Sequence, residues 1–326
     1  MLPTEPSYAE ACNICEKWML PQWQPSLDAI IAQHQLDVLA IEQNLEGANP
    51  VFMLLTTDKE HLVLKLIAPL WQSQFDSECY SLQQLQAQPL GIKTPQLRYQ
   101  GQYRGWYYLI QERLDGITLD KVLPQMTIPE RCHIAIALGQ FAKHMHQQPI
   151  PTEHPLNIDW RAFLTNQLKI CVDKRRRQGL TGPLLSDLPR YLARHSKGLF
   201  TAEFGAKIQL THTDLHPGNL LVQPSRVGYQ LTGIIDFGDA LACPDITFEF
   251  TSVAMLLALG NARVFHAFLD GYQYQGPRDN SLQRHLMMLS LLRHTGDLNY
   301  LLNTVPGCHE MTRWSDLEAK FFPISD

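Results

Sequence analysis

The sequence lacks a long hydrophobic run, an excess of positive charge and a secretion signal. Its net charge is −5 over 326 residues, so we expect neither nucleic acid nor an anionic membrane among its partners. The longest apolar stretch, at residues 251–259, is too short to span a bilayer. The first residues show neither the basic nor the apolar segment of a signal peptide. A cytoplasmic protein is therefore expected.

The cysteines form no pattern that would indicate a disulfide framework. There are seven of them at irregular spacing, which favours a reducing compartment. Cys12 and Cys15 form a C-x-x-C pair, but no second pair or redox motif accompanies it. Together with Tyr8 and Trp18 they recur at helical spacing. We therefore predict an N-terminal helix with these side chains on its buried face.

The sequence is poor in charged residues, at 18%, apart from one strongly basic run. Residues 174–177 read Lys-Arg-Arg-Arg and lie beside polar residues. Such a run is more often a solvated helix face than a binding patch. We therefore predict that this run is a solvated helix face.

Two hydrophobicity patterns follow one another along the chain. The first part holds five short strand-like runs joined by turns, at residues 36–45, 51–56, 61–67, 96–100 and 106–111. A helix is predicted at residues 74–86. From residue 119 the pattern is mainly helical, with predicted helices at residues 128–146, 160–172 and 189–195. We expect an α+β fold with a small antiparallel β-sheet lobe at residues 1–112 and a larger, mainly helical lobe at residues 113–326.

The stretch from His212 to Asn219 carries the clearest chemical signal. It reads His-Thr-Asp-Leu-His-Pro-Gly-Asn, and Ile-Ile-Asp-Phe-Gly-Asp follows at residues 234–239. Phosphoryl transfer needs a carboxylate near the attacking hydroxyl and hard oxygen ligands for Mg²⁺. A hairpin between the two motifs would bring Asp236 back beside Asn219. The pattern predicts Asp214 as the catalytic base, with Asn219 and Asp236 as the metal ligands.

A lysine in an apolar strand provides the second signal. Lys65 lies in Leu-Val-Leu-Lys-Leu-Ile, where a charged side chain is costly unless it is paired. Glu78, thirteen residues later in the predicted helix, is its natural partner. A lysine on the nucleotide phosphates, held by a helix glutamate, is what a kinase site requires. We therefore assign both residues to nucleotide binding.

Two further segments are expected to contact the nucleotide through their backbones. The turn that holds Gly47 and Asn49 joins two strands and would lie over the phosphates through its N–H groups. The last strand of the small lobe ends in the expected hinge. Backbone groups near Glu112 and Leu114 would pair there with the adenine edge.

These residues together resemble the aminoglycoside phosphotransferase and choline kinase superfamily, which consists of small-molecule relatives of protein kinases with a protein-kinase-like fold. The resemblance covers about residues 45–250. It rests on Lys65, Glu78, His212, Asp214, the His-Pro-Gly-Asn sequence of residues 216–219, and Asp236. It implies ATP and Mg²⁺ as cofactors and in-line transfer of the γ-phosphoryl group to a hydroxyl of a small molecule. His212 is implied as a catalytic-loop residue that buttresses the loop from below.

Further family-like features and departures surround this set. Asp245 and Glu249 stand where the family has a pair of acids at the start of the next helix, and we expect this pair to brace the catalytic loop. Thr213 stands where many relatives have Gly, a change that we expect the loop to absorb. Pro50 follows the single glycine of the nucleotide loop, which leaves the geometry of that loop open. Position 213 is not Arg and no Ala-Pro-Glu follows Asp236, so a protein kinase is disfavoured.

The acceptor remains open at this point. An aminoglycoside kinase is one reading, a metabolic kinase for choline, an amino acid or a sugar-amine is a second, and a nucleotide-binding regulatory pseudokinase is a third. A cationic acceptor would need a carboxylate-lined cleft. The C-terminal region offers acids and aromatics for one, namely Asp270, Asp297, Glu310, Asp316, Glu318, Tyr272, Tyr274 and Trp314. The sequence sets neither the oligomeric state nor the choice between ATP and GTP.

Overall fold

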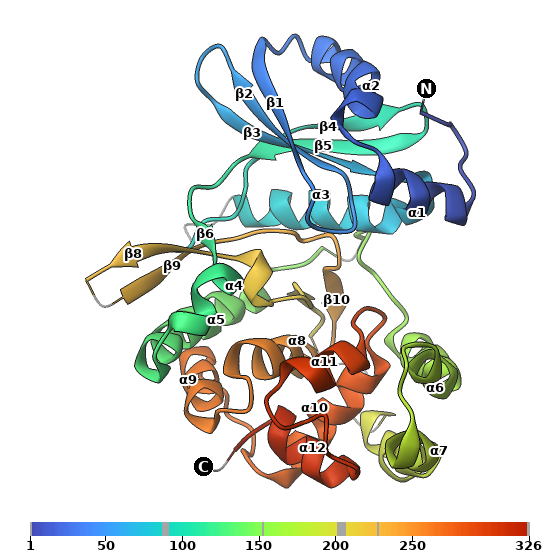
Figure 1. Cartoon of the computed structure of the whole chain (residues 1–326). Helices are drawn as coiled ribbons and strands as arrows, with labels where there is room; N and C mark the ends of the chain where they lie inside the picture. The colour runs from blue at the N-terminus through green and yellow to red at the C-terminus, as the bar shows by residue number, and fades with distance from the viewer. Residues whose placement is uncertain (1, 87–90, 152, 201–206, 227, 325–326) are drawn as a thin grey trace. The chain divides into compact units, whose positions relative to one another are not determined.

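The chain is described here by a computed structural model of residues 2–86, 91–151, 153–200, 207–226 and 228–324 (Figure 1). It forms two compact units. The first comprises Met1–Pro89, Lys93–Asp115 and Ile234–Ala240, and the second comprises Leu90–Ile92, Gly116–Gly233 and Leu241–Asp326. The segment that carries Asp236 therefore belongs to the first unit. The predicted lobe boundary at residue 112 stays a prediction.

The first unit is built on a five-stranded antiparallel sheet in the order β1-β2-β3-β5-β4. Its strands are β1 (Val38–Asn44), β2 (Val51–Thr56), β3 (His61–Ile67), β4 (Leu97–Tyr103) and β5 (Trp106–Glu112). Its helices are α1 (Tyr8–Lys17), α2 (Leu20–Gln33) and α3 (Gln72–Gln86). The predicted α+β class is confirmed, and every predicted strand of the sheet is present.

Both faces of this sheet are covered, which explains the near-continuous apolar runs of β3 and β5. On β3, Leu64 and Leu66 belong to the main core of the unit. Ile67 belongs to a second, smaller cluster that includes Cys79 of α3. Because alternate side chains of a strand point to opposite faces, Lys65 lies on the same face as Ile67. The strand pattern therefore directs this lysine toward α3.

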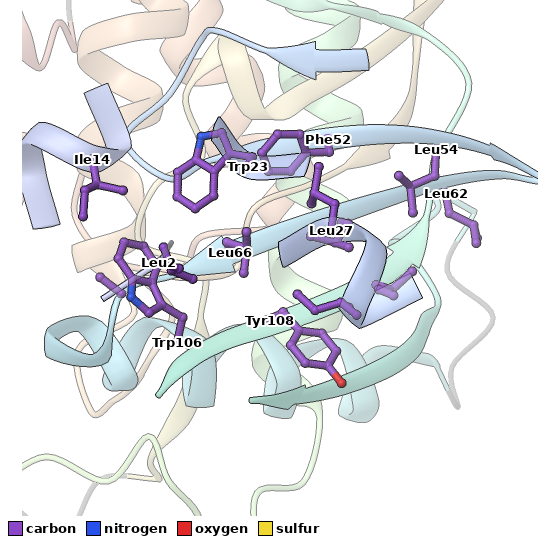
Figure 2. Packing of buried hydrophobic residues seen from close by; sticks show 14 of the residues in the cluster. Leu2, Ile14, Trp23, Leu27, Phe52, Leu54, Leu62, Leu66, Trp106 and Tyr108 are labelled. Carbon is purple, nitrogen blue, oxygen red and sulfur yellow. The ribbon is translucent and has the colours of Figure 1, made fainter. Parts of the chain in front are cut away.

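The main core lies between the sheet and the N-terminal helices. Trp23 of α2 is fully buried, and its ring contacts those of Phe52 and Trp106 edge to face at centroid distances of 5.9 and 5.8 Å (Figure 2). Leu27, also on α2, lies beside the same strands. Aromatic clusters of this kind bury large apolar areas and dominate the energy of a small core.

The N-terminal helices differ from the prediction in two respects. The predicted helix is present as α1, but its buried side chains are Ala11 and Ile14. Tyr8 is exposed and Cys12 is only partly buried, whereas Cys15 and Trp18 pack against the main core, so the predicted buried face is correct only in part. The second helix, α2, was not predicted.

The second unit is mainly helical, as expected. Its helices are α4 (Leu119–Val122), α5 (Ile128–Gln147), α6 (Trp160–Arg177), α7 (Gly182–His195), α8 (Thr247–Ser252), α9 (Ala262–Tyr272), α10 (Asn280–Leu292), α11 (Leu298–Thr304) and α12 (Trp314–Phe321). A π-helical segment, Val253–Ala258, continues α8. The short strands are β6 (Ile117–Thr118), β7 (Gln209–Thr211), β8 (Leu220–Ser225), β9 (Gly228–Ile234) and β10 (Leu241–Cys243). They form a β6-β8-β9 sheet and a β10-β7 pair.

Helix α5 illustrates how the sequence sets these elements. Thr127 and Glu130 form a capping box at its start, and each side chain bonds the other's backbone N–H. Further along, Gly139 faces α9 so closely that a Cβ there would collide with the carbonyl of Phe268. Gly271 of α9 has the same relation to the carbonyl of Ile136. The glycines thus allow the two helix backbones to pack closely.

The basic run at the end of α6 is solvated only in part. Arg176 and Arg177 are exposed, whereas Lys174 is partly buried and Arg175 is buried. Arg175 is 2% exposed and donates hydrogen bonds to the carbonyl groups of Ser290, Leu291 and Gly296. Lys174 donates to the carbonyl group of Arg293 at 2.7 Å. These cations satisfy the carbonyls at and just beyond the C-terminus of α10, which a helix leaves without partners. Among the described helices, none is long and apolar enough to cross a membrane.

Candidate active site

In the first unit, Lys65 lies between two carboxylates. Its Nζ is 2.7 Å from Oε2 of Glu78 and 2.7 Å from Oδ1 of Asp236. Both Lys65 and Glu78 are buried, whereas the Asp236 side chain is 51% exposed. Strand β3, helix α3 and the segment after β9 each supply one of these groups. The predicted pairing of Lys65 with Glu78 is present, and Asp236 joins it.

The electrostatics of this trio keep the lysine charged. Burial alone would lower the pKa of the Lys65 ammonium, but the charges of Asp236 and Glu78 outweigh burial and hold that pKa above its usual value. Asp236 itself has a φ of +64°, a left-handed conformation that costs energy in a residue with a side chain. Such conformations persist where the surrounding structure enforces them, and they are frequent at functional sites.

The nucleotide-loop residues lie between β1 and β2. Gly47 has a φ of +102°, which favours glycine, and a Cβ there would meet nothing within 4 Å. Asn49 Nδ2 donates to Oε1 of Gln74 on α3 at 3.2 Å. Gln74 Nε2 in turn donates to Oδ1 of Asp239 at 3.4 Å. A chain of amides thus connects this loop to the segment that carries Asp236.

The expected hinge follows the end of β5. The N–H of Glu112 donates to the carbonyl of Gln96 at 2.9 Å and is therefore engaged within the sheet. Leu114 is partly buried two residues beyond the strand. A role for Glu112 or Leu114 in binding the base stays a prediction.

In the second unit, the loop between β7 and β8 folds around Asp214. Asn219 Nδ2 donates to the Asp214 carbonyl at 3.1 Å and lies 3.5 Å from its Oδ2. His216 Nε2 is also 3.5 Å from Oδ2, and its Nδ1 accepts the Gly218 N–H at 3.0 Å. Thr213 has a φ of +64° and is fully buried. The loop accommodates this threonine, but in a conformation that glycine adopts without strain.

His212 and Glu249 support this loop from within the unit. His212 is fully buried, its N–H donates to Oε2 of Glu249 at 2.6 Å, and its Nδ1 accepts the Asp214 N–H at 3.3 Å. Glu249 therefore braces the loop as expected. The carboxylate of Asp245 instead accepts the hydroxyl of Thr247 and contacts Nε2 of His285. Although burial alone would raise the pKa of Asp245, the contact with His285 holds it below its usual value.

Arg293 is a site residue that sequence reasoning missed. Its Nη2 is 3.4 Å from Oδ1 of Asp214, and its Nη1 donates to Oγ1 of Thr251 at 3.0 Å. The guanidinium carbon lies 5.6 Å from the centre of the Phe248 ring, within cation–π range. Arg293 is the first residue after α10, in a mainly apolar part of the sequence, and it belongs to no recognised motif. An arginine at the end of an apolar helix is the one signal that could have identified it.

The predicted ligands of Mg²⁺ belong to different units, Asn219 to the second and Asp236 to the first. Their convergence on one ion stays a prediction. The donor chemistry nevertheless suits the implied cofactors. The half-exposed carboxylate of Asp236 is a hard oxygen donor of the kind Mg²⁺ prefers. Lys65 has three N–H donors, of which two are directed at carboxylates, so one remains for a phosphate oxygen.

The fold and these side chains define a class of kinase-like phosphotransferases. The chain belongs to the phosphotransferase enzyme family (APH), which matches residues 40–280. The predicted relationship is thereby confirmed. A search of curated proteins finds no match.

Solved structures of aminoglycoside phosphotransferases share the fold. The GDP complex of aminoglycoside 2'-phosphotransferase-IIIa superimposes with a TM-score of 0.64 at 18% identity, covering 82% of this chain and 87% of that one. The gentamicin complex of APH(2")-IIa gives a TM-score of 0.59 at 16% identity, covering 91% and 97%. APH(3'')-Id from Streptomyces rimosus, with ADP and streptomycin, gives 0.56 at 17% identity, covering 83% and 98%. At such identities the likeness establishes the fold alone.

Proposed function

We propose that this protein transfers the γ-phosphoryl group of ATP to a hydroxyl of a small molecule. The observation that carries the proposal is the contact of the buried Lys65 ammonium with both Glu78 and Asp236 at 2.7 Å. A buried cation between two carboxylates has little value as a stabilising device, because replacing buried ion pairs by apolar residues is often neutral or stabilising. A site for a polyphosphate and a metal ion explains its presence.

Each residue has a defined task in this proposal. Lys65, oriented by Glu78, binds the α- and β-phosphates. Asp236 and Asn219 would hold Mg²⁺, which when bound offsets the negative charge of the phosphates. Asp214 orients the acceptor hydroxyl and takes its proton. His212 acts through the loop, since it is fully buried and its Nδ1 accepts the Asp214 N–H.

Replacement of the base tests the assignment. Asp214→Asn is expected to lower kcat by about 10² or more, because it removes a group that acts mainly in the transition state. ADP release would be measured with Mg²⁺-ATP and a panel of aminoglycosides, choline, amino alcohols, sugar-amines and nucleosides. Asp173→Asn is the matched control, because that side chain is 71% exposed on α6. Turnover of the Asp214 variant at the wild-type rate would refute the role of Asp214.

The panel also separates the alternative functions. Turnover with choline, an amino alcohol or a sugar-amine would indicate a metabolic kinase. Tight Mg²⁺-dependent ATP binding with no turnover of any compound would leave two readings, an acceptor that the panel lacks and the regulatory pseudokinase. The family relatives that bind kanamycin, gentamicin or streptomycin make aminoglycosides the first compounds to test.

A further inference from the structure

A pocket of about 600 Å³ lies beside Asp214, entirely within the second unit. Apolar side chains supply much of its wall, and they come from the turn after α4, the π-helical segment and α11. These are Leu123, Met255, Leu256, Leu259, Leu298 and Leu301. A cavity of this size and lining accommodates a small organic molecule with an apolar body.

Arg293 places a positive charge next to Asp214, the proposed base. Its side chain is 7% exposed, and it lines the same pocket as Asp214. An acceptor hydroxyl hydrogen-bonded to Asp214 would lie within a few ångströms of this guanidinium, whose Nη2 is 3.4 Å from Oδ1 of Asp214. A cationic amine close to that hydroxyl would be repelled by Arg293, because charges interact strongly where water is partly excluded.

The acids that line the pocket are already engaged and do not offset the positive charge of Arg293. Asp297 caps α11, and its Oδ1 accepts the N–H groups of Asn299 and Tyr300. Asp120 is exposed and lies 3.8 Å from the ammonium of Lys121. The remaining acid, Asp214, already faces Arg293.

The other acids that the sequence offered for a cationic substrate are not part of this pocket wall. Arg278 pairs with Asp270, Arg313 pairs with Asp316, and Glu318 accepts the hydroxyl of Tyr191. Glu310 is also absent from the wall, as are the aromatic side chains considered with these acids. Of the acids that the sequence offered for a cationic acceptor, only Asp297 lines this pocket.

We propose that this pocket takes a hydroxyl compound with an apolar body and no cationic amine, in class an apolar alcohol or an apolar hydroxy acid. The inference rests on the phosphotransfer proposed above, which brings the acceptor hydroxyl to Asp214. It distinguishes this chain's acceptor from the polycationic compounds named for the structures that share its fold.

A matched series of ligands tests the charge preference. Octan-1-ol, 2-hydroxyoctanoate and 2-aminooctan-1-ol, called octanol, hydroxyoctanoate and aminooctanol below, share the apolar chain and differ in charge. In the last two compounds the charged group lies next to the hydroxyl, where Arg293 would act on it. Isothermal titration of the full chain is expected to give at least tenfold tighter binding of octanol and hydroxyoctanoate than of aminooctanol, and no binding of kanamycin. Binding of aminooctanol or kanamycin as tightly as octanol would overturn the proposal, as would the absence of binding by all three octyl compounds.

A substitution in the pocket wall locates the binding. Leu301→Glu places a carboxylate on a half-buried wall position of α11 and is expected to tighten aminooctanol binding at least tenfold. Asn303→Glu adds the same charge on the same helix at an exposed position outside the wall, and it should leave the binding order unchanged. Circular dichroism would verify that both variants fold. An unchanged aminooctanol affinity in folded Leu301→Glu would show that the ligands bind elsewhere.

ADP release with the same compounds separates this inference from the proposed function. If the binding order is as expected but no compound stimulates ADP release from Mg²⁺-ATP, phosphotransfer is refuted while the preference of the pocket stands. If ADP release requires an amine-bearing acceptor, phosphotransfer stands and the pocket inference is refuted.

Discussion

His294 follows Arg293 in the chain and lies near Lys174, so its ring titrates in a cationic environment. Burial first, and then the charges of Arg293 and Lys174, lower its pKa from 6.5 to about 4, although Asp214 opposes the shift. Its Nδ1 is buried and has no hydrogen-bond partner among the described residues. The folded protein therefore resists protonation at this position.

This shift predicts a loss of stability in mild acid. Below pH 6.5 the unfolded state binds a proton that the folded state accepts only near pH 4, so acid favours unfolding in that window. Between pH 6.5 and pH 4, the free energy of unfolding measured with urea is expected to fall by about 2–3 kcal/mol because of His294. His294→Gln should flatten the profile, while His309→Gln, at a side chain that is 60% exposed, should not. Parallel profiles for wild type and His294→Gln would contradict the prediction.

At the scale of single residues, the sequence was informative where chemistry restricts the residue type. Lys65 and Glu78 could be paired because a lysine in an apolar strand needs a partner, and the structure places them 2.7 Å apart. Arg293 could not be assigned, because its contact with Asp214 joins residues 79 positions apart and depends on where α10 ends. Contacts of this kind follow from tertiary packing, which local patterns do not encode.

At the scale of elements, the end of α6 holds the end of α10. Arg175 donates to the carbonyl groups of Ser290 and Leu291 at 3.1 and 2.8 Å, and Lys174 donates to that of Arg293. Burial, together with the charge of Arg175, lowers the pKa of Lys174 to about 8. The two cations thus fix the segment from which Arg293 reaches Asp214.

Loss of the hydrogen bonds that Arg175 donates should lower the stability of the fold. Arg175→Met is expected to reduce the free energy of unfolding by about 2–4 kcal/mol, because buried carbonyls lose charged hydrogen-bond donors. Arg177→Met is the matched control on the same helix, where the side chain is exposed and the expected change is within about 0.5 kcal/mol. Thermal and urea unfolding would measure both. Equal stability of the two variants would show that the buried arginine is dispensable.

The elements that could be predicted are those in which local pattern and tertiary role agree. Strands β2 and β3 match the predicted ranges, since turns bound them on both sides. Helix α2 was missed because Pro21 and Pro25 lie within it, although its first turn tolerates one of them. Helix α7 was predicted only from residue 189 because Pro189 lies inside it. The basic run of α6 was misjudged because its composition does not reveal which arginine faces α10.

At the scale of the whole molecule, the chain leaves its first unit after Asp115 and returns to it at Ile234–Ala240. Lys65, Glu78 and Asp236 therefore all belong to one unit, although Asp236 lies 171 positions from Lys65. Asp214, Arg293 and the apolar pocket belong to the other. The residues proposed for the nucleotide phosphates and those proposed for the acceptor can thus be tested separately.

Two isosteric substitutions should separate the effects of the units on nucleotide binding. Mg²⁺-ATP at about 100 times its Kd is expected to stabilise the wild-type chain by about 2.7 kcal/mol, which raises the Tm. Asp236→Asn should abolish the Mg²⁺-dependent part of this rise, because it removes a charged oxygen ligand beside Lys65. Asp214→Asn makes the same chemical change in the second unit and should retain most of the rise while it loses turnover. A Tm rise that survives Asp236→Asn but disappears in Asp214→Asn would reverse the proposed division of tasks, because Asp214 and not Asp236 would then be the residue on which Mg²⁺-ATP binding depends.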